Sequence, residues 1–303
     1  MLITIYLYMA KSQRIIYYYQ TFKGLDDLIN DPNSCHVTHI HLASIHFGLN
    51  KNFLPYIHLN DYSPSNSIFD NVWKQLSILY SRGIKIVLMV GGAGGAFMEL
   101  FSNFKAYYNL LLDTIKQYDI ITGIDLDIEE IVSLKNIKML MRQIKTDFPS
   151  KDFIITMAPL GSSLQYDSPG MGGFVYKDLY TSPEGEYIEY FNGQFYMDYS
   201  SMAYNSCISN GYPENKVVMG MITGEDFTNV KETIKELCKQ YKNFGGAYNW
   251  EYFNSPPAGI TYPGEWAKTI YEILSESNSE INIKNKSESN SEDKSEVNSC
   301  NVI

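Results

Sequence analysis

Short β-branched or aromatic runs alternate with amphipathic helical patterns along most of this chain. Eight runs have the length and composition of strands, and they lie at residues 14–19, 37–47, 85–92, 121–128, 153–159, 190–197, 216–221 and 245–250. Amphipathic stretches separate several of them, at residues 69–83, 99–119, 131–149 and 229–245. Strand–helix alternation predicts parallel strands, and eight units in roughly 260 residues predict a closed (β/α)8 TIM barrel of class α/β. A doubly wound open sheet is the alternative, but the first candidate turn, at residues 20–22, lacks the glycines that bind phosphate.

Composition excludes several classes of protein. A hydrophobic fraction of 45% with 14% aromatic residues is enough for a large buried core. The net charge of −10 opposes binding to nucleic acid or to anionic lipid. No run reaches the ~18 apolar residues of a membrane span. The four cysteines are far apart and form no CxxC pair, so neither a disulfide framework nor a zinc site is expected from Cys35, Cys207, Cys238 and Cys300.

The ends of the chain differ from its centre. We expect one catalytic barrel over residues 14–275, with an N-terminal segment at 1–13 and a disordered tail at 276–303 that is rich in Ser, Asn, Glu and Lys. The opening MLITIYLYMAK has no basic residue before its apolar run, so it is a poor signal peptide and reads as a strand or packed segment. The ending after Cys300 loosely fits a prenylation motif, but Asn301 and the acidic tail fit it poorly.

The stretch IDLDIE, at residues 124–129, places three carboxylates at alternate positions. Side chains on a strand alternate between faces, so Asp125, Asp127 and Glu129 share one face and would point into a barrel. Same-face neighbours lie about 6.6 Å apart, which is close enough for the carboxylates to share a proton and raise at least one pKa. A proton held near neutral pH is what a general acid needs.

Three other interpretations of this stretch fit the sequence less well. Random acids on an exposed edge strand would not be flanked by large aliphatic residues. A divalent-metal site is chemically reasonable, because hard cations bind carboxylate oxygens, but no histidine or further acidic cluster completes the ligand set. Phosphoryl transfer would need a phosphate-binding loop, and the glycine-rich residues 91–95 fit neither the dinucleotide fingerprint nor the P-loop.

Residues 122–129, TGIDLDIE, resemble the DGxDxDxE signature of glycoside hydrolase family 18, the chitinases and their relatives. Four further fragments resemble family motifs in the same order: MVGG at 89–92, ITMAP at 155–159, QFY at 194–196 and GGAYNW at 245–250. The resemblance covers residues 14–275. It implies a (β/α)8 barrel that hydrolyses β-1,4-linked N-acetylglucosamine polymers, such as chitin or chito-oligosaccharides, without a cofactor or metal.

The resemblance also implies a substrate-assisted, retaining mechanism, in which the N-acetyl group of the substrate attacks the anomeric carbon. Glu129 would protonate the glycosidic oxygen and later deprotonate water. Asp127 would bind the acetamide N–H and stabilise the oxazolinium cation, and Asp125 would support Asp127. Tyr196 would donate to the acetamide carbonyl.

A second set of residues is expected to bind the sugar. Trp250 would stack under the distorted −1 sugar and Gln194 would bind beside it, although without the resemblance a tryptophan near a strand end would be read as core. Tyr18 would lie near Asp125. The remaining expected substrate-binding residues are Gly91, Gly92 and Met157.

Two positions depart from the family pattern. Thr122 stands in place of the first aspartate and Met89 in place of a serine whose hydroxyl normally lies near the residue matching Asp125. We therefore expect Asp125 to be harder to ionise than in a typical member. Glu129 is retained, which favours an enzyme over a lectin. No large insertion precedes the last strand, and the resulting open groove favours endo cleavage by family analogy.

Alternatives to a chitinase remain open at this stage. An endo-β-N-acetylglucosaminidase acting on the chitobiose core of N-glycans would share every catalytic residue named above. A non-catalytic lectin that binds chitin or another glycan is the alternative outside the enzymes, and a metal-dependent enzyme is a more distant one. We expect a monomer, and the resemblance favours an extracellular location although the leader is poor.

Overall fold

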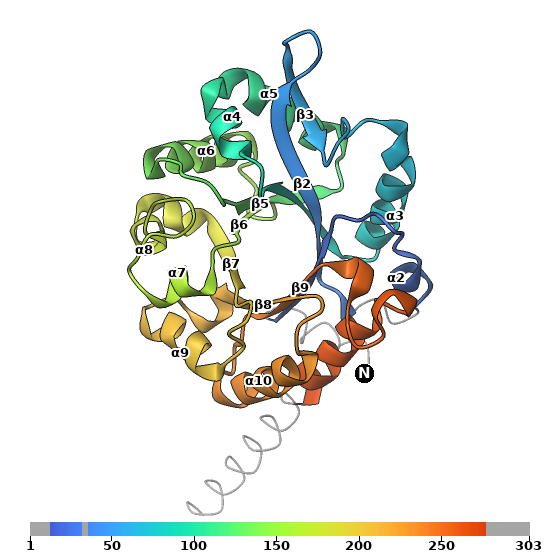
Figure 1. Cartoon of the computed structure of the whole chain (residues 1–303), viewed down its shortest axis with the longest axis vertical. Helices are drawn as coiled ribbons and strands as arrows, with labels where there is room; N and C mark the ends of the chain where they lie inside the picture. Colours follow the sequence, from blue (N-terminus) through green and yellow to red (C-terminus); the bar gives the residue numbers. More distant parts are fainter. Residues whose placement is uncertain (1–12, 32–35, 277–303) are drawn as a thin grey trace, which may run out of the picture.

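The computed structural model describes residues 13–31 and 36–276 (Figure 1). The expectations for residues 1–12, for the tail beyond residue 276 and for Cys35 and Cys300 fall outside these described residues. Among the residues that the structure describes, no helix is long and apolar enough to cross a membrane.

Eight parallel strands form a closed ring, which confirms the predicted (β/α)8 barrel. Their order around the ring is β1-β9-β8-β7-β6-β5-β4-β2, and β2 pairs with β1 to close it. The strands are β1 (Arg14–Tyr19), β2 (His39–Leu49), β4 (Lys85–Gly91), β5 (Ile121–Asp127), β6 (Ile154–Met157), β7 (Ile188–Gln194), β8 (Val217–Ile222) and β9 (Gly246–Trp250).

Helices surround the ring, as Figure 1 shows. They are α2 (Asp26–Asn30), α3 (Asp70–Ser81), α4 (Ala96–Ser102), α5 (Phe104–Gln117), α6 (Leu134–Asp147), α7 (Gly161–Gln165), α8 (Tyr176–Tyr180), α9 (Ser201–Ser209) and α10 (Phe227–Gln240). A last helix covers residues 265–276. Side-chain caps set the start of two long helices: Ser133 accepts from the amide of Asn136 before α6, and Asp226 accepts from the first amides of α10.

A ninth strand, β3 (Pro55–Leu59), was missed by the sequence analysis. It pairs antiparallel with the end of β2 and forms a hairpin that projects beyond the ring at the top of Figure 1. Ile57 and Leu59 are buried, whereas Tyr56 and His58 on the other face are partly exposed. Five residues beginning with proline give only a weak strand signal.

The side chains of the barrel strands form two separate layers of core. Ile124 and Leu126 belong to the large cluster between strands and helices. Tyr18, Met89 and Tyr248 belong to a smaller cluster inside the ring. Asp125 and Asp127 are buried and alternate with the aliphatic residues of β5. The expected inward direction of these two carboxylates is therefore confirmed.

The last helix is attached to the first strand. The Tyr17 hydroxyl donates to the Pro263 carbonyl (2.7 Å) and accepts from the Ala267 amide (3.0 Å). The Tyr17 ring also packs against Trp266, with 5.0 Å between ring centroids, and both side chains are fully buried. One buried phenol thus fixes this helix against β1.

Tyr17→Phe is expected to lower the free energy of unfolding by about 1–3 kcal/mol, because two buried backbone groups lose their partner. Urea denaturation measures this change. Tyr80→Phe, at a side chain that is 41% exposed on α3, is the matched control and should change stability little. Equal effects of the two substitutions would contradict this account of the last helix.

Candidate active site

A cleft of about 730 Å³ opens where the barrel strands end. Gln194, Ile222 and Trp250 are the last residues of β7, β8 and β9, and all three line it. Functional groups of a TIM barrel gather at this end. Of the residues predicted from sequence, the cleft brings together Gly92, Asp127, Glu129, Gln194, Tyr196 and Trp250.

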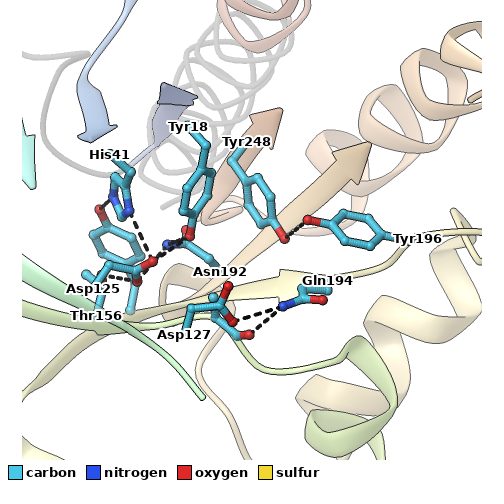
Figure 2. A network of polar contacts seen from close by, with 11 residues as sticks. Tyr18, His41, Asp125, Asp127, Thr156, Asn192, Gln194, Tyr196 and Tyr248 are labelled. Carbon is cyan, nitrogen blue, oxygen red and sulfur yellow. Dashed lines mark hydrogen bonds and ion pairs between the residues drawn. The ribbon is translucent and has the colours of Figure 1, made fainter. Parts of the chain in front are cut away.

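Asp125 lies below the cleft and is completely buried. Its carboxylate accepts hydrogen bonds from the hydroxyls of Tyr18 (2.7 Å) and Thr156 (2.5 Å) and from the Asn192 amide (3.2 Å), and His41 Nδ1 lies 3.4 Å away (Figure 2). Burial raises the pKa of Asp125, but the attraction of His41 and the donated hydrogen bonds outweigh it, so the pKa is lower than usual. Asp125 is therefore the ionised member of the cluster.

Asp127 lies next to the cleft floor and is 5% exposed. Burial, followed by the negative charges of Glu129 and Asp125, raises the pKa of Asp127 well above its ordinary value. The Gln194 amide donates to Asp127 Oδ1 (3.2 Å) and to Glu129 Oε1 (3.4 Å). A proton held by the three carboxylates therefore lies on Asp127 or Glu129, on the side that faces the cleft.

The expectation that Met89 makes Asp125 harder to ionise than in a typical family member stays a prediction. Met89 is indeed paired with Asp125 in the sheet and brings no hydroxyl. However, donors from β1, β6 and β7 reach Asp125, and its pKa is lowered rather than raised. The group that resists ionisation is Asp127.

Glu129 is placed differently from the other two acids. β5 ends at Asp127, so Glu129 lies on the following loop and is partly exposed in the cleft. The next residue, Glu130, fixes this loop, because its carboxylate accepts from the amides of Phe97 (2.6 Å) and Met98 (3.3 Å) at the start of α4. The loop therefore leaves Glu129 accessible while Glu130 attaches it to the helix.

Two aromatic side chains, Tyr196 and Trp250, line the cleft, and each contacts a buried tyrosine. Tyr248 donates its hydroxyl hydrogen to the Tyr196 oxygen (3.0 Å), and Trp250 packs over Tyr18 with 5.2 Å between ring centroids. Gly220 makes room for Tyr248, because a Cβ at this position would lie 1.9 Å from its ring. Tyr196 and Trp250 thus reach the cleft from a rigid support, in the positions expected from sequence.

Three predicted sugar-binding residues do not line the cleft. Met157 is fully buried in the layer between strands and helices, because the residue of β6 that faces Asp125 is Thr156. Tyr18 is buried below the cleft and contacts Asp125. Gly91 has φ +104°, and a Cβ there would lie 2.1 Å from the Asp127 carbonyl oxygen. Gly91 therefore permits close approach of two strands and does not line the cleft.

The sequence analysis also missed residues that complete the site. His41, Thr156 and Asn192 surround Asp125. The alternation of side chains along a strand could have identified Asn192, because it shares a face of β7 with Gln194. Polar side chains of the β2–β3 hairpin and its flank, which were not predicted as site residues, also line the cleft, namely Ser44, His46, His58, Asn60 and Asp61. No group of three or more His, Cys, Asp or Glu side chains in the described part of the chain is placed to hold a metal ion.

Comparison with known proteins agrees with this geometry. The sequence model of the Glycosyl hydrolases family 18 matches residues 14–294. The chain belongs to this family. It is therefore a family 18 glycosidase by sequence and fold, and the resemblance seen in its motifs is confirmed. A comparison with curated proteins finds no match.

Solved structures of the family show the same barrel. A fungal endo-beta-N-acetylglucosaminidase from family 18 is 31% identical, with 86% of this chain and 98% of that chain covered and a TM-score of 0.77. Chitinase ChiC from Aspergillus fumigatus is 30% identical, with 84% and 97% covered and a TM-score of 0.74. A family 18 chitinase from Pseudoalteromonas aurantia, 20% identical with 86% and 100% covered and a TM-score of 0.65, shares the fold.

Thr122, the other departure from the family 18 signature, lies away from the cleft. Its hydroxyl donates to the Ile86 carbonyl of β4 (3.1 Å), near the start of β5. It therefore joins two strands and makes no contact with the carboxylates in this structure.

Asp127→Asn is expected to stabilise the folded protein at neutral pH. Below about pH 3.9 the aspartate is protonated in both states, so variant and wild type should differ little. As the pH rises, the unfolded chain ionises while the folded protein keeps its proton, which destabilises the wild type until the pH reaches the raised folded-state pKa. The gain should approach about 1.4 kcal/mol per unit of pKa difference, measured by urea denaturation at several pH values.

The matched control is Asp113→Asn, at an exposed position of α5. Its effect on stability should stay small over the same pH range. An advantage of Asp127→Asn that stays constant or shrinks from pH 4 to pH 8 would contradict a raised pKa for Asp127.

Proposed function

We propose that the protein hydrolyses β-1,4 linkages in chitin or chito-oligosaccharides by a substrate-assisted, retaining mechanism. The observation that carries the proposal is the division of charge within one cluster: Asp125 is ionised, Asp127 resists ionisation, and Gln194 connects Asp127 to Glu129. Such a cluster can hold a proton for a leaving group and a negative charge for a developing cation.

In the proposed first step, the acetamide oxygen of the −1 sugar attacks the anomeric carbon while Glu129 protonates the departing glycosidic oxygen. Asp127 accepts the acetamide N–H, and Tyr196 donates to the acetamide oxygen. Once Glu129 has lost its proton, the Asp127 O–H donates a hydrogen bond to the Glu129 carboxylate and keeps its proton. The negative charges of Asp125 and Glu129 then stabilise the oxazolinium cation.

In the proposed second step, Glu129 removes a proton from water, which attacks the anomeric carbon and opens the oxazolinium ring. Two inversions at this carbon retain its configuration. No side chain acts as nucleophile. The buried Asp125 thus has an electrostatic role, and the partly exposed Glu129 exchanges protons.

The shape of the cleft supports endo cleavage of a polymer. Trp250 offers a partly exposed indole that can pack against a sugar ring. The connection from β8 to β9 contains only α10 and short turns, so no additional domain covers this side of the cleft. A chain that extends beyond the cleft at both ends can therefore bind.

A second candidate substrate is the chitobiose core of N-glycans. It contains the same N-acetylglucosamine pair, and the 31% identity to a fungal endo-beta-N-acetylglucosaminidase supports it. The proposed chemistry is the same for both substrates. The two substrates differ in the sugars attached to the N-acetylglucosamine pair, and the cleft must accommodate these sugars.

The test is hydrolysis of fluorogenic chitobiose and chitotriose glycosides, with a high-mannose glycoprotein as a parallel substrate. Glu129→Gln should reduce hydrolysis at least about 100-fold, because it removes the general acid. Glu232→Gln, at an exposed glutamate of α10, should leave the rate unchanged. Activity should survive EDTA, and proton NMR should show the β-anomer as the first product.

Each other outcome has a distinct meaning. Release from the glycoprotein alone would identify the N-glycan substrate. Binding of chito-oligosaccharides without hydrolysis would indicate a lectin. Loss of activity in EDTA, or an α-anomer as first product, would overturn the proposed mechanism.

A further inference from the structure

We propose that His41 is a positioning residue that holds Asp125 in its ionised form through the Nδ1–H that faces Asp125 Oδ2, and so keeps the shared proton on Asp127 and Glu129. This inference rests on the proposed function for its catalytic meaning. The contact itself can be tested without any substrate.

The geometry fixes which ring nitrogen faces the carboxylate. His41 and Asp125 are both completely buried, with Nδ1 3.4 Å from Asp125 Oδ2. Nε2 lies 3.1 Å from the Tyr190 hydroxyl (Figure 2). A carboxylate only accepts, so the nitrogen that faces it carries a hydrogen. Nδ1 has no hydrogen-bond partner among the described residues, and its 3.4 Å contact with Asp125 Oδ2 is an ion-pair distance.

Asp125 is the acid among the groups that pack around the imidazole. Tyr18 approaches from β1 with 4.8 Å between ring centroids, and His39 on β2 itself lies at 6.4 Å. Tyr190 on β7 lies at 6.2 Å, and the Arg14 guanidinium stacks over the Tyr190 ring, 4.2 Å from its centroid. On β4, the residue paired with His41 is the apolar Val87.

The two carboxylate oxygens of Asp125 differ in the hydrogen-bond donors that contact them. Oδ1 accepts from Thr156 and Asn192, whereas Oδ2 accepts from Tyr18 and faces His41. Burial raises the pKa of Asp125, and the attraction of His41 is the largest influence that lowers it. His41 therefore supplies the polar contact that Met89 cannot give.

Loss of this contact should let Asp125 compete for the proton. A donor that faces a buried charged group is worth up to about one to two units of pKa. Activity then begins to fall at a higher pH on the acidic side, because Asp125 becomes protonated there. The acidic limb of the pH–kcat profile should move up by about one to two pH units, and KM should change little, because His41 does not line the cleft.

The experiment uses four variants of the full chain. His41→Leu and His41→Phe remove the donor, and Phe keeps the bulk of the ring in case Leu does not fold. His41→Asn keeps an N–H at the position of Nδ1. His39→Leu is the matched control, because His39 is also buried on the same face of β2 but its Nδ1 contacts Thr38 (2.7 Å).

The first readout is the ¹³C resonance of the Asp125 carboxyl carbon in protein labelled with [4-¹³C]aspartate, assigned by its absence in Asp125→Asn. The midpoint of its titration should rise by about one to two pH units in His41→Leu and His41→Phe. It should stay near the wild-type value in His41→Asn and His39→Leu. The second readout is the pH–kcat profile, which should follow the same order.

An unchanged midpoint in both donor-free variants would overturn the proposal. So would a midpoint in His41→Asn that moves as far as in His41→Leu, because the N–H that faces Asp125 would then not be the cause. If wild-type protein hydrolyses neither substrate, the proposed function fails, but the carboxyl titration still decides the role of His41.

Discussion

The active site depends on the stabilisation of one buried negative charge. A carboxylate removed from water is costly unless donors replace its hydration. Asp125 meets this condition with groups from four other strands, namely Tyr18, His41, Thr156 and Asn192. These donors satisfy Asp125, whereas burial and repulsion raise the pKa of the neighbouring Asp127 despite the hydrogen bond from Gln194. The charge pattern at the cleft follows from this asymmetry.

The barrel makes such an arrangement possible. Parallel strands place alternate side chains on the axis, so residues more than 100 positions apart in sequence, such as Tyr18 and Asp125, come within 2.7 Å. The rigid layers on either side prevent these groups from turning away. In contrast, Glu129 lies beyond the strand end, where it can reach both a leaving group and water. The buried, rigid Asp127 and the accessible Glu129 are thus only two residues apart on one segment.

Sequence reasoning predicted what depends on local pattern and missed what depends on distant partners. The alternation of strands and helices and of acids and aliphatics on β5 predicted the barrel and the inward carboxylates. Met157 was assigned to the wrong face, because a shift of one residue along a strand exchanges its faces and Thr156 is the inward one. The ionised state of Asp125 could not be inferred, because its donors come from other strands. The short β3 had too little pattern to detect.

The attachment of the last helix to Tyr17 has a consequence for biosynthesis. The first strand pairs with β9, and its phenol is satisfied only when Pro263 and Ala267 are in place. Contacts of such long sequence separation form late and slow folding. During translation the barrel therefore cannot close until nearly the whole chain has left the ribosome, and the edge of β1 that pairs with β9 stays exposed until then. Chaperones that shield nascent strand edges would act on this protein through that interval.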